Sequence, residues 1–226
     1  HIPAQIPAID RKQFFTDENV IEIALATDFK NLMTHKQKEI YQAATITMIF
    51  PDSVKRTEEI EIKARGEYRK AECYIPNIML NFKTPRAQVF TKLGRLKLVW
   101  GCGKTSYDEQ LVLKEYLVYK IYNLLTDKSF RVRLVRISCT DIKSKIKPFK
   151  EYAFFIEDVD DMAKRNNCGE IEPVKLHTEA TDRQQATLMA LFQYMIGNTD
   201  FAVPLIRNIK LIQRKGDSLS PPYEAP

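Results

Sequence analysis

The chain has 226 residues, of which 44% are hydrophobic and 28% are charged, values that are ordinary for a globular protein and exclude disorder as its main state. Only 7 residues are glycine, no G-x-G-x-x-G pattern occurs, and apolar stretches are far shorter than the ~18 residues needed to span a bilayer; we therefore expect a soluble domain with neither a dinucleotide-binding fold nor an integral membrane segment. The formal net charge of +6 favours anionic partners, although the charges are interspersed.

The N-terminal half is predicted to be rich in strands. Its first dozen residues contain Pro3 and Pro7 and are expected to form an extended lead-in. Alternation of apolar and polar residues then predicts strands at residues 20–26, 41–50, 59–65, 74–82 and 96–100. The polar segment 28–38 is expected to be a short helix or a loop.

A long amphipathic helix is predicted at about residues 108–125. Leucine and isoleucine recur there at helical spacing, from Leu113 to Leu124. Ser106 and Glu109 form a capping box, in which each side chain would bond the other residue's backbone N–H. The chain therefore changes from strands to a helix at this point.

The second half is predicted to contain strands at residues 130–139, 151–157 and 208–212 and a short helix at residues 159–165. A second capping box, Thr181 to Gln184, would begin an apolar helix that ends at Gly197. The tail, residues 218–226, is rich in turn-forming residues and is expected to be a connection cut short.

Two local patterns have simpler interpretations than function. Residues 101–105 (GCGKT) lie between a strand and a helix, as a phosphate-binding P-loop would, but the first glycine of that motif would fall at Leu98, inside the strand. Arg131, Arg133 and Arg136 are the densest basic spacing, and they lie in an alternating strand pattern without a nucleic-acid-binding motif. We therefore expect a strand-to-helix turn, a solvated strand face and no nucleic-acid partner.

The four cysteines have no C-x-x-C spacing and the three histidines are scattered, so we expect no zinc site. An even number of cysteines allows two disulfides in an exported protein, but the spacing does not give their connectivity. His1 stands first in place of Met, so we expect a chain that has been processed or trimmed.

The polar loop after the apolar helix suggests phosphoryl transfer. Asp200 follows the helix, and Asn208 comes eight residues later, before a strand. Kinases use one carboxylate to orient the acceptor hydroxyl and an amide oxygen to help hold Mg²⁺. The alternative is a polar turn that merely ends the helix, and the motif alone favours that alternative.

The order of predicted elements is that of an α+β, protein-kinase-like two-lobed fold. In such a fold a strand lysine pairs with a helix glutamate to position the nucleotide phosphates. Lys97 and Glu115 are the candidates, and Lys83 is the second candidate for the lysine because it also ends a strand. For each, a solvated charge on a strand edge or helix face is the alternative.

Six short blocks also occur in order: 64–69 (ARGEYR), 80–83 (LNFK), 96–99 (LKLV), 115–119 (EYLVY), 152–157 (YAFFIE) and 197–200 (GNTD). This ordered set resembles the spore-coat-protein-H-like (CotH) family of atypical kinases, especially its exported bacterial branch. The resemblance covers about residues 59–213. It rests on the order of the blocks, because no single block is specific enough by itself.

The resemblance implies a kinase that uses ATP with Mg²⁺ or Mn²⁺ and phosphorylates Ser or Thr in exported or surface proteins. Asp200 matches the family's catalytic-loop Asp, and Asn208 matches its metal-binding Asn. Arg65 and Arg69 match an Arg-Gly-Asn-x-Arg block near the nucleotide. Glu157 matches the end of the strand that leads to the interlobe hinge.

The chain departs from the family pattern at two positions. Glu67 stands where Asn is usual, and Arg207 stands where His precedes the metal-binding Asn. Cys73 and Cys102 stand where the exported branch also places cysteines, so the resemblance implies a disulfide between them. The departures at Glu67 and Arg207 favour the alternative of a non-catalytic pseudokinase or a cell-surface binding module.

The family continues to a Tyr-Asp-Phe-Asp-like segment whose Asp ligates metal, whereas this chain ends at Pro226. We expect a protein that ends there to have little or no kinase activity. Together the patterns predict a strand-rich N-lobe at residues 1–157 and a partial helical C-lobe at residues 158–226, with the catalytic-loop-like segment at 197–208. A nucleotide is the expected partner, and export to the periplasm or cell envelope is the expected location.

Overall fold

The computed structural model describes residues 9–50, 54–85, 89–103, 105–171, 178–203, 207–216 and 223–225. The predicted lead-in at residues 1–8, Lys104 of the glycine-rich turn and most of the tail lie outside the described residues. The chain divides into two compact units, which consist of His1–Tyr116 with Val132–Ile156 and of Leu117–Arg131 with Glu157–Pro226.

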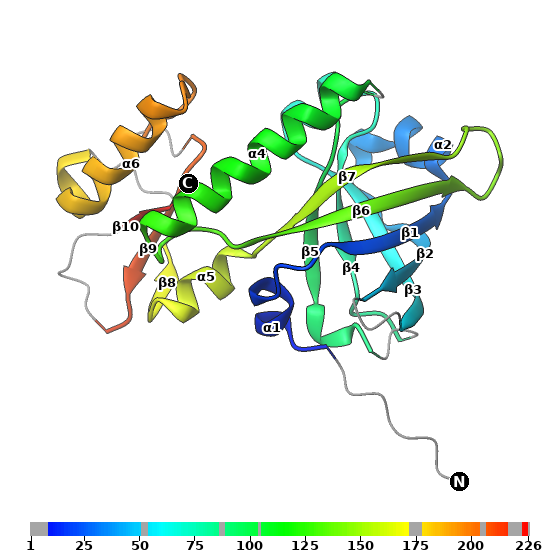
Figure 1. Cartoon of the computed structure of the whole chain (residues 1–226), viewed down its shortest axis with the longest axis horizontal. Helices are drawn as coiled ribbons and strands as arrows, with labels where there is room; N and C mark the ends of the chain where they lie inside the picture. The colour runs from blue at the N-terminus through cyan, green and yellow to red at the C-terminus, as the bar shows by residue number, and fades with distance from the viewer. Residues whose placement is uncertain are drawn as a thin grey trace, which may run out of the picture. The chain divides into compact units, whose positions relative to one another are not determined.

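The first unit is a closed barrel of seven strands (Figure 1). The strands are β1 (Ile21–Thr27), β2 (Gln42–Ile49), β3 (Lys55–Arg65), β4 (Asn77–Asn81), β5 (Arg95–Val99), β6 (Val132–Asp141) and β7 (Phe149–Ile156). They follow the order β1-β2-β3-β4-β5-β7-β6, and parallel pairing of β1 with β6 closes the barrel. The protein is therefore α+β, as predicted, and its sheet has both parallel and antiparallel neighbours.

The barrel forms because its strands alternate between a buried and an exposed face. In β3 the side chains of Ile60, Ile62 and Ala64 are buried in the core, whereas the intervening side chains face outward. Closure leaves no unpaired edge strand, which would otherwise expose a row of backbone hydrogen-bonding groups. The predicted strand at residues 74–82 is shorter in the structure, because Pro76 has no N–H to donate and pairing begins at Asn77.

Short helices connect the strands of this unit: α1 (Arg11–Thr16), α2 (Phe29–Thr34), η1 (Lys36–Lys38), α3 (Glu67–Glu72) and η2 (Thr91–Leu93). The expectation of an extended segment through residue 12 was wrong, because the side chain of Asp10 accepts hydrogen bonds from the N–H groups of Lys12 and Gln13 and begins α1. The α2 and η1 helices confirm the prediction of a helix or loop at residues 28–38.

The long helix α4 (Ser106–Leu125) confirms the predicted helix, but its capping box lies one residue earlier than expected. The hydroxyl of Thr105 accepts the N–H of Asp108 at 3.2 Å, and the Asp108 carboxylate accepts the N–H of Thr105 at 3.1 Å. Glu109 instead accepts the backbone N–H of Tyr152 on β7 at 2.8 Å. The carboxylate of Glu109 is therefore used to attach the start of α4 to the barrel.

In its described residues the second unit contains the end of α4, two further α-helices, a short 3₁₀-helix and a small sheet. The described elements are α5 (Val159–Arg165), β8 (Cys168–Glu170), η3 (Thr178–Ala180), α6 (Arg183–Met195), β9 (Lys210–Arg214) and β10 (Tyr223–Ala225). The sheet has the order β10-β9-β8. The turn-rich tail contains a short strand at residues 223–225, which pairs with β9 through backbone groups and needs no apolar periodicity.

The helix α6 confirms the predicted apolar helix, although Asp182 and not Thr181 caps it, by accepting the N–H of Gln185 at 2.8 Å. Its buried face packs on α4, where the rings of Tyr122 and Phe192 lie 4.6 Å apart.

Among the helices that the structure describes, none is both long enough and apolar enough to cross a membrane.

Candidate functional site

The outer face of the barrel carries the first group of sequence-predicted residues. In β5 the side chains of Leu96 and Leu98 are buried in the barrel core, so Lys97 faces outward between them. Strand register places Lys97 beside Met79 of β4 on one side and beside Ile156 of β7 on the other. Lys97 therefore lies, half-buried, in a row of outward-facing side chains that crosses three strands.

Arg65, Arg69 and Glu115 are brought together although they come from β3, α3 and α4. We call these three residues the Arg69 cluster. The Nη2 of Arg69 lies 3.4 Å from Oε2 of Glu115, and Arg65 is close enough to interact with the same carboxylate through its charge. Arg65 is the last residue of β3, and the positive φ of Gly66 (82°) turns the chain from that strand into α3. The turn thus sets both arginines beside α4.

The charge balance of the Arg69 cluster is positive, with two guanidinium groups beside one carboxylate. Burial raises the pKa of the Glu115 carboxyl above its usual value, and the charges of Arg69 and Arg65 act in the opposite direction. The side chains of Arg69 and Glu115 are 26% and 39% exposed, so solvent reaches the cluster. A partly exposed surplus of positive charge is suited to binding an anion such as a phosphate group.

The first half of α4 is held against the same outer face of the barrel. Phe154 of β7 faces outward, and its ring lies 6.1 Å from the ring of Tyr116. Because Glu115 and Tyr116 are neighbours on α4, this contact and the Glu109 bond to Tyr152 fix the part of the helix that carries Glu115. Figure 1 shows this half of α4 running beside β7.

A disulfide joins Cys73, just after α3, to Cys102, just after β5. This is the pairing that the family resemblance implied. Arg69 also donates through Nη1 to the backbone carbonyl of Trp100 at 3.3 Å, and the Trp100 indole donates to the carbonyl of Pro76 at 2.8 Å. The Arg69 guanidinium is therefore held between α4 and the segment that follows β5.

Lys83, the second candidate for the phosphate-binding lysine, lies at the opposite end of the barrel from Arg65. Arg65 pairs with Asn77 at the start of β4, whereas Lys83 is exposed two residues beyond Asn81 at its other end. Six residues of extended chain span roughly 20 Å. Of the two lysines, Lys97 is therefore the one on the same side of the barrel as the arginines.

Glu157 belongs to the second unit and has a structural environment. Its buried carboxylate receives Nε and Nη2 of Arg165 at 3.1 Å each, and it accepts the backbone N–H of Arg131 at 3.0 Å. Arg165 also donates to the carbonyl groups of Asp127 and Ser129. Both carboxylate oxygens of Glu157 therefore have partners within this unit, and neither needs an external ligand.

The loop that we call the Asp200 loop comprises residues 197–208, of which 204–206 lie outside the described part of the chain. Asn208 donates through Nδ2 to the carbonyl of Asp200 at 2.7 Å and to Oδ2 of its side chain at 3.2 Å. Arg207 forms an ion pair with Oδ1 of Asp200 at 3.0 Å. Both residues that sequence reasoning selected for this loop, Asp200 and Asn208, are thus in direct contact.

Local contacts hold the start of the Asp200 loop. Gly197 has a φ of 67° and ends α6, with the N–H of Asn198 bonded to the carbonyl of Gln193 at 2.9 Å. The Asn198 amide donates to Oε1 of buried Gln193 and accepts the N–H of Asp200. Sequence reasoning missed Gln193, although a glutamine on the apolar face of a predicted helix is a signal for a buried hydrogen bond.

The Asp200 loop contains oxygen atoms of the kind that ligate a hard cation. The amide of Asn208 uses its nitrogen to bond Asp200, so its oxygen makes no hydrogen bond with any described residue. The described residues contain no group of three or more His, Cys, Asp or Glu side chains that could hold a metal. Magnesium commonly binds one or two protein carboxylates together with phosphate oxygens and water. Asp200 and Asn208 supply atoms of these types, and a metal ion would have to displace Arg207 or Asn208 from an oxygen of Asp200.

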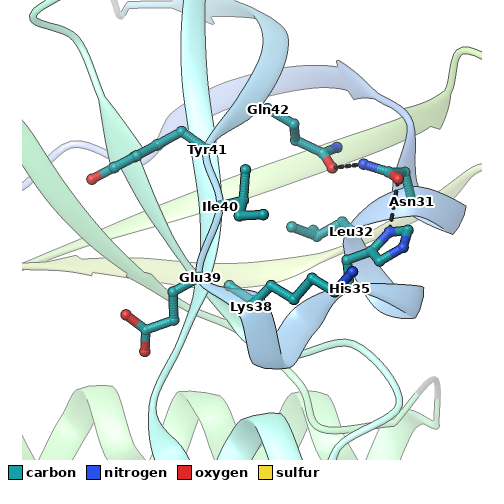
Figure 2. A pocket seen from close by; sticks show the side chains of 9 residues that line it. Asn31, Leu32, His35, Lys38, Glu39, Ile40, Tyr41 and Gln42 are labelled. Carbon is teal, nitrogen blue, oxygen red and sulfur yellow. Dashed lines mark hydrogen bonds between the residues drawn. The ribbon is translucent and has the colours of Figure 1, made fainter.

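A separate pocket of ≈ 250 Å³ opens on the first unit between α2 and the start of β2 (Figure 2). Asn31 bonds both Nδ1 of His35 at 2.9 Å and Oε1 of Gln42 at 2.8 Å, so these polar side chains satisfy one another. Glu39, on the rim, pairs with Lys63 and Lys70. None of the residues that sequence reasoning selected lines this pocket.

Comparisons of this chain with protein-family models, with curated proteins and with solved structures found no match.

Proposed function

We propose that the protein is a kinase-like phosphotransferase of the spore-coat-protein-H-like type, with a protein-kinase-like two-lobed fold. It would bind ATP with Mg²⁺ or Mn²⁺ and act on Ser or Thr of exported or surface proteins. The observation that carries this proposal is the direct contact of Asp200 with Asn208 in a loop that follows the half-buried helix α6. Protein kinases use a catalytic-loop carboxylate to orient the substrate hydroxyl and an asparagine of the same loop to help hold Mg²⁺.

In this proposal the two units have different tasks. Asp200 orients the hydroxyl of the substrate, accepting a hydrogen bond from it, and Asn208 with Asp200 would hold the metal ion. The metal supplies charge neutralisation at the phosphate oxygens. In the first unit Lys97, Arg65 and Arg69 present positive charge to phosphate groups, and Glu115 orients Arg69. Glu157 supports the fold through its pair with Arg165 rather than binding the nucleotide through its carboxylate.

A second candidate function is a non-catalytic pseudokinase or surface-binding module. The ion pair between Arg207 and Asp200 favours it, because it occupies the carboxylate that a substrate hydroxyl would need. Glu67 also favours it: the residue that replaces the usual Asn is exposed and pairs with Lys70 at 2.8 Å, not with a group that faces a phosphate.

Titration with ATP, with and without Mg²⁺ or Mn²⁺, separates these functions when thermal unfolding is followed. The kinase proposal expects stabilisation that depends on the metal, since a ligand that binds only the folded state raises its stability. Asp200→Asn should abolish the metal-dependent part, and Asp127→Asn, which alters an exposed carboxylate elsewhere in the same unit, should not. The proposal is contradicted if the metal and ATP do not stabilise the parent protein. It is also contradicted if the metal-dependent stabilisation persists in Asp200→Asn.

The phosphate-binding role of the first unit needs its own variant. Lys97→Met should weaken binding of ATP measured by calorimetry about tenfold or more, because a hydrogen bond to a charged group is lost. Lys92→Met, which removes an exposed lysine on η2, is the matched control and should leave the affinity unchanged. Equal affinities of the two variants would exclude Lys97 from the site.

A further inference from the structure

The disulfide between Cys73 and Cys102 lies next to the Arg69 cluster, in contact with Arg69. It links the end of α3 to the loop between β5 and α4, two segments 29 residues apart in sequence. The N–H of Tyr74 bonds the carbonyl of Cys102 at 3.0 Å, which makes a second connection between the same segments. Arg69 reaches both: its Nη1 lies 3.3 Å from the Trp100 carbonyl and 4.0 Å from the sulfur of Cys73.

Residues of opposite charge lie near the two cysteines. Two cations lie at Cys73, because Arg69 contacts its sulfur and Lys36 donates to its carbonyl at 2.9 Å. Two carboxylates lie beside Cys102, at its glycine neighbours. A Cβ placed on Gly103 would be 2.7 Å from Oδ2 of Asp108, and one placed on Gly101 would be 2.9 Å from Oε2 of Glu151.

The two cysteines also differ in access. Cys73 is 1% exposed, whereas Cys102 is only partly buried. Cys102 is the more accessible of the two residues, and when a thiolate attacks its sulfur, the sulfur of Cys73 becomes the leaving group. Thiol–disulfide exchange is faster when the leaving thiolate is stabilised, and a neighbouring guanidinium stabilises a thiolate.

We propose that the Cys73–Cys102 disulfide is a thiol-exchange site that controls the position of Arg69. A dithiol reductant attacks the sulfur of Cys102, the S–S bond breaks, and the Cys73 thiolate leaves beside Arg69. The second thiol of the reductant then displaces Cys102, which leaves and takes up a proton. The protein disulfide gains two electrons and one proton, which Cys102 takes up, while Cys73 stays a thiolate; the reductant is oxidised to its disulfide and releases its other proton to solvent.

Reduction changes what Arg69 can bind. In the disulfide form Arg69 pairs with Glu115 and the Trp100 carbonyl. In the reduced form the Cys73 thiolate competes for the same guanidinium, and the segment that carries Trp100 loses its covalent link to α3 and keeps the hydrogen bond from Tyr74 to Cys102. Arg69 then turns from Glu115 and from the outer face of the barrel. The consequence for nucleotide binding rests on the proposed function, whereas the exchange chemistry does not.

The exchange chemistry is tested without nucleotide, by following release of thiols when the protein is treated with dithiothreitol. Arg69→Gln should slow reduction about threefold or more, because the Cys73 thiolate loses its stabilising charge. Arg95→Gln removes an arginine from the other end of β5 and should leave the rate unchanged. A variant that merely loosened the fold would be reduced faster, so an equal or faster rate in Arg69→Gln overturns the proposal.

Counting thiols is straightforward because the two other cysteines are hidden. Cys139 and Cys168 are buried, and burial raises the pKa of both thiols, which makes them slow to react. Mass spectrometry of the partly reduced protein, trapped with an alkylating reagent, identifies the sulfur attacked. The mixed disulfide with the reductant should be found on Cys102, and its occurrence on Cys73 would contradict the assignment.

The effect on the site is tested by comparing ATP binding to the oxidised protein, the reduced protein and Cys73→Ser/Cys102→Ser in the presence of Mg²⁺. Affinity should be about tenfold weaker in the last two, the loss expected for one bond to a charged group. Equal affinities in all three forms would refute control of Arg69 by the disulfide. If the oxidised protein binds no ATP, the proposed function fails instead, and the rate measurement still decides the exchange chemistry.

Discussion

The Arg69 cluster and the Asp200 loop are held in place in different ways. In the first, Arg69 and Glu115 are 46 residues apart and come from α3 and α4, and a disulfide secures the segments around them. In the second, Asp200 and Asn208 are eight residues apart, and the bonds that connect them lie within one loop. The cluster therefore depends on the fold of its whole unit, whereas the loop depends mainly on its own residues and the helix end before it.

The ion pair of Glu157 and Arg165 stabilises the fold of the second unit. Arg165→Met would leave the Glu157 carboxylate buried without its partner, and the free energy of unfolding should fall by about 3–5 kcal/mol. Denaturant unfolding followed by circular dichroism measures this loss.

The double variant Glu157→Gln/Arg165→Met should recover part of that stability, because no unpaired charge remains. A loss below about 1 kcal/mol in the single variant would mean that solvent reaches Glu157, and the carboxylate would again be a candidate for ligand binding.

Removal of the disulfide tests how far the Arg69 cluster depends on its cross-link. Cys73→Ser/Cys102→Ser should lower the free energy of unfolding of the first unit by about 3–4 kcal/mol, the value expected for a link across 29 residues. Cys139→Ser, which alters a free buried thiol, tests whether the loss belongs to the link itself. If both variants lost the same amount, packing of the sulfur atoms would explain the effect.

Backbone strain at the start of the Asp200 loop should by itself lower the stability of the protein. Gly197 has a positive φ and open space around it, so Gly197→Ala should cost about 1–2 kcal/mol through strain without any steric clash. Gly169→Ala also meets open space, but the φ of Gly169 is not positive, and this variant should change stability by less than about 0.5 kcal/mol. Equal losses of stability in the two variants would mean that the positive φ of Gly197 at the end of α6 does not hold the loop in its conformation.

Burial of Glu115 in the Arg69 cluster predicts how its carboxyl titrates. Because burial raises its pKa in the folded state, Glu115 takes up a proton at a higher pH in the folded protein than in the unfolded chain. Its contribution to stability is therefore fully present below the unfolded pKa and is lost as pH rises through the folded pKa.

NMR titration of the Glu115 carboxyl measures this directly. Arg69→Gln should raise the pKa of Glu115 further, because an opposing positive charge is removed. A pKa that falls in this variant would show that Arg69 is not the partner of Glu115 in solution.

The strands and the long helices could be predicted because they depend on local patterns. Alternation in β3 and the helical spacing in α4 recur within a few residues, and the structure places these elements within a few residues of the predicted bounds. The capping residues were wrong by one position in both helices, since Thr105 with Asp108 and then Asp182 competed successfully with neighbours of the same chemical type. Sequence patterns cannot rank such neighbours, because the choice depends on how the chain enters the helix.

For the candidate site, sequence reasoning selected Glu157 and Arg69 among other residues, but it could not supply their partners. Arg165 as the partner of Glu157, and Trp100 as the acceptor for Arg69, came from the structure. These contacts join residues from different elements, and no periodicity connects them.

The sequence by itself determined the α+β composition of this protein, the positions of most strands and of α4 and α6, and the placing of Asp200 and Asn208 in one loop. Only the tertiary structure decided that seven strands close into a barrel, since closure requires β1 to pair with β6 and β5 with β7. It also decided which outward-facing charges meet. Local propensities act over one or two turns of chain, whereas these pairings depend on which distant segments bury the same core.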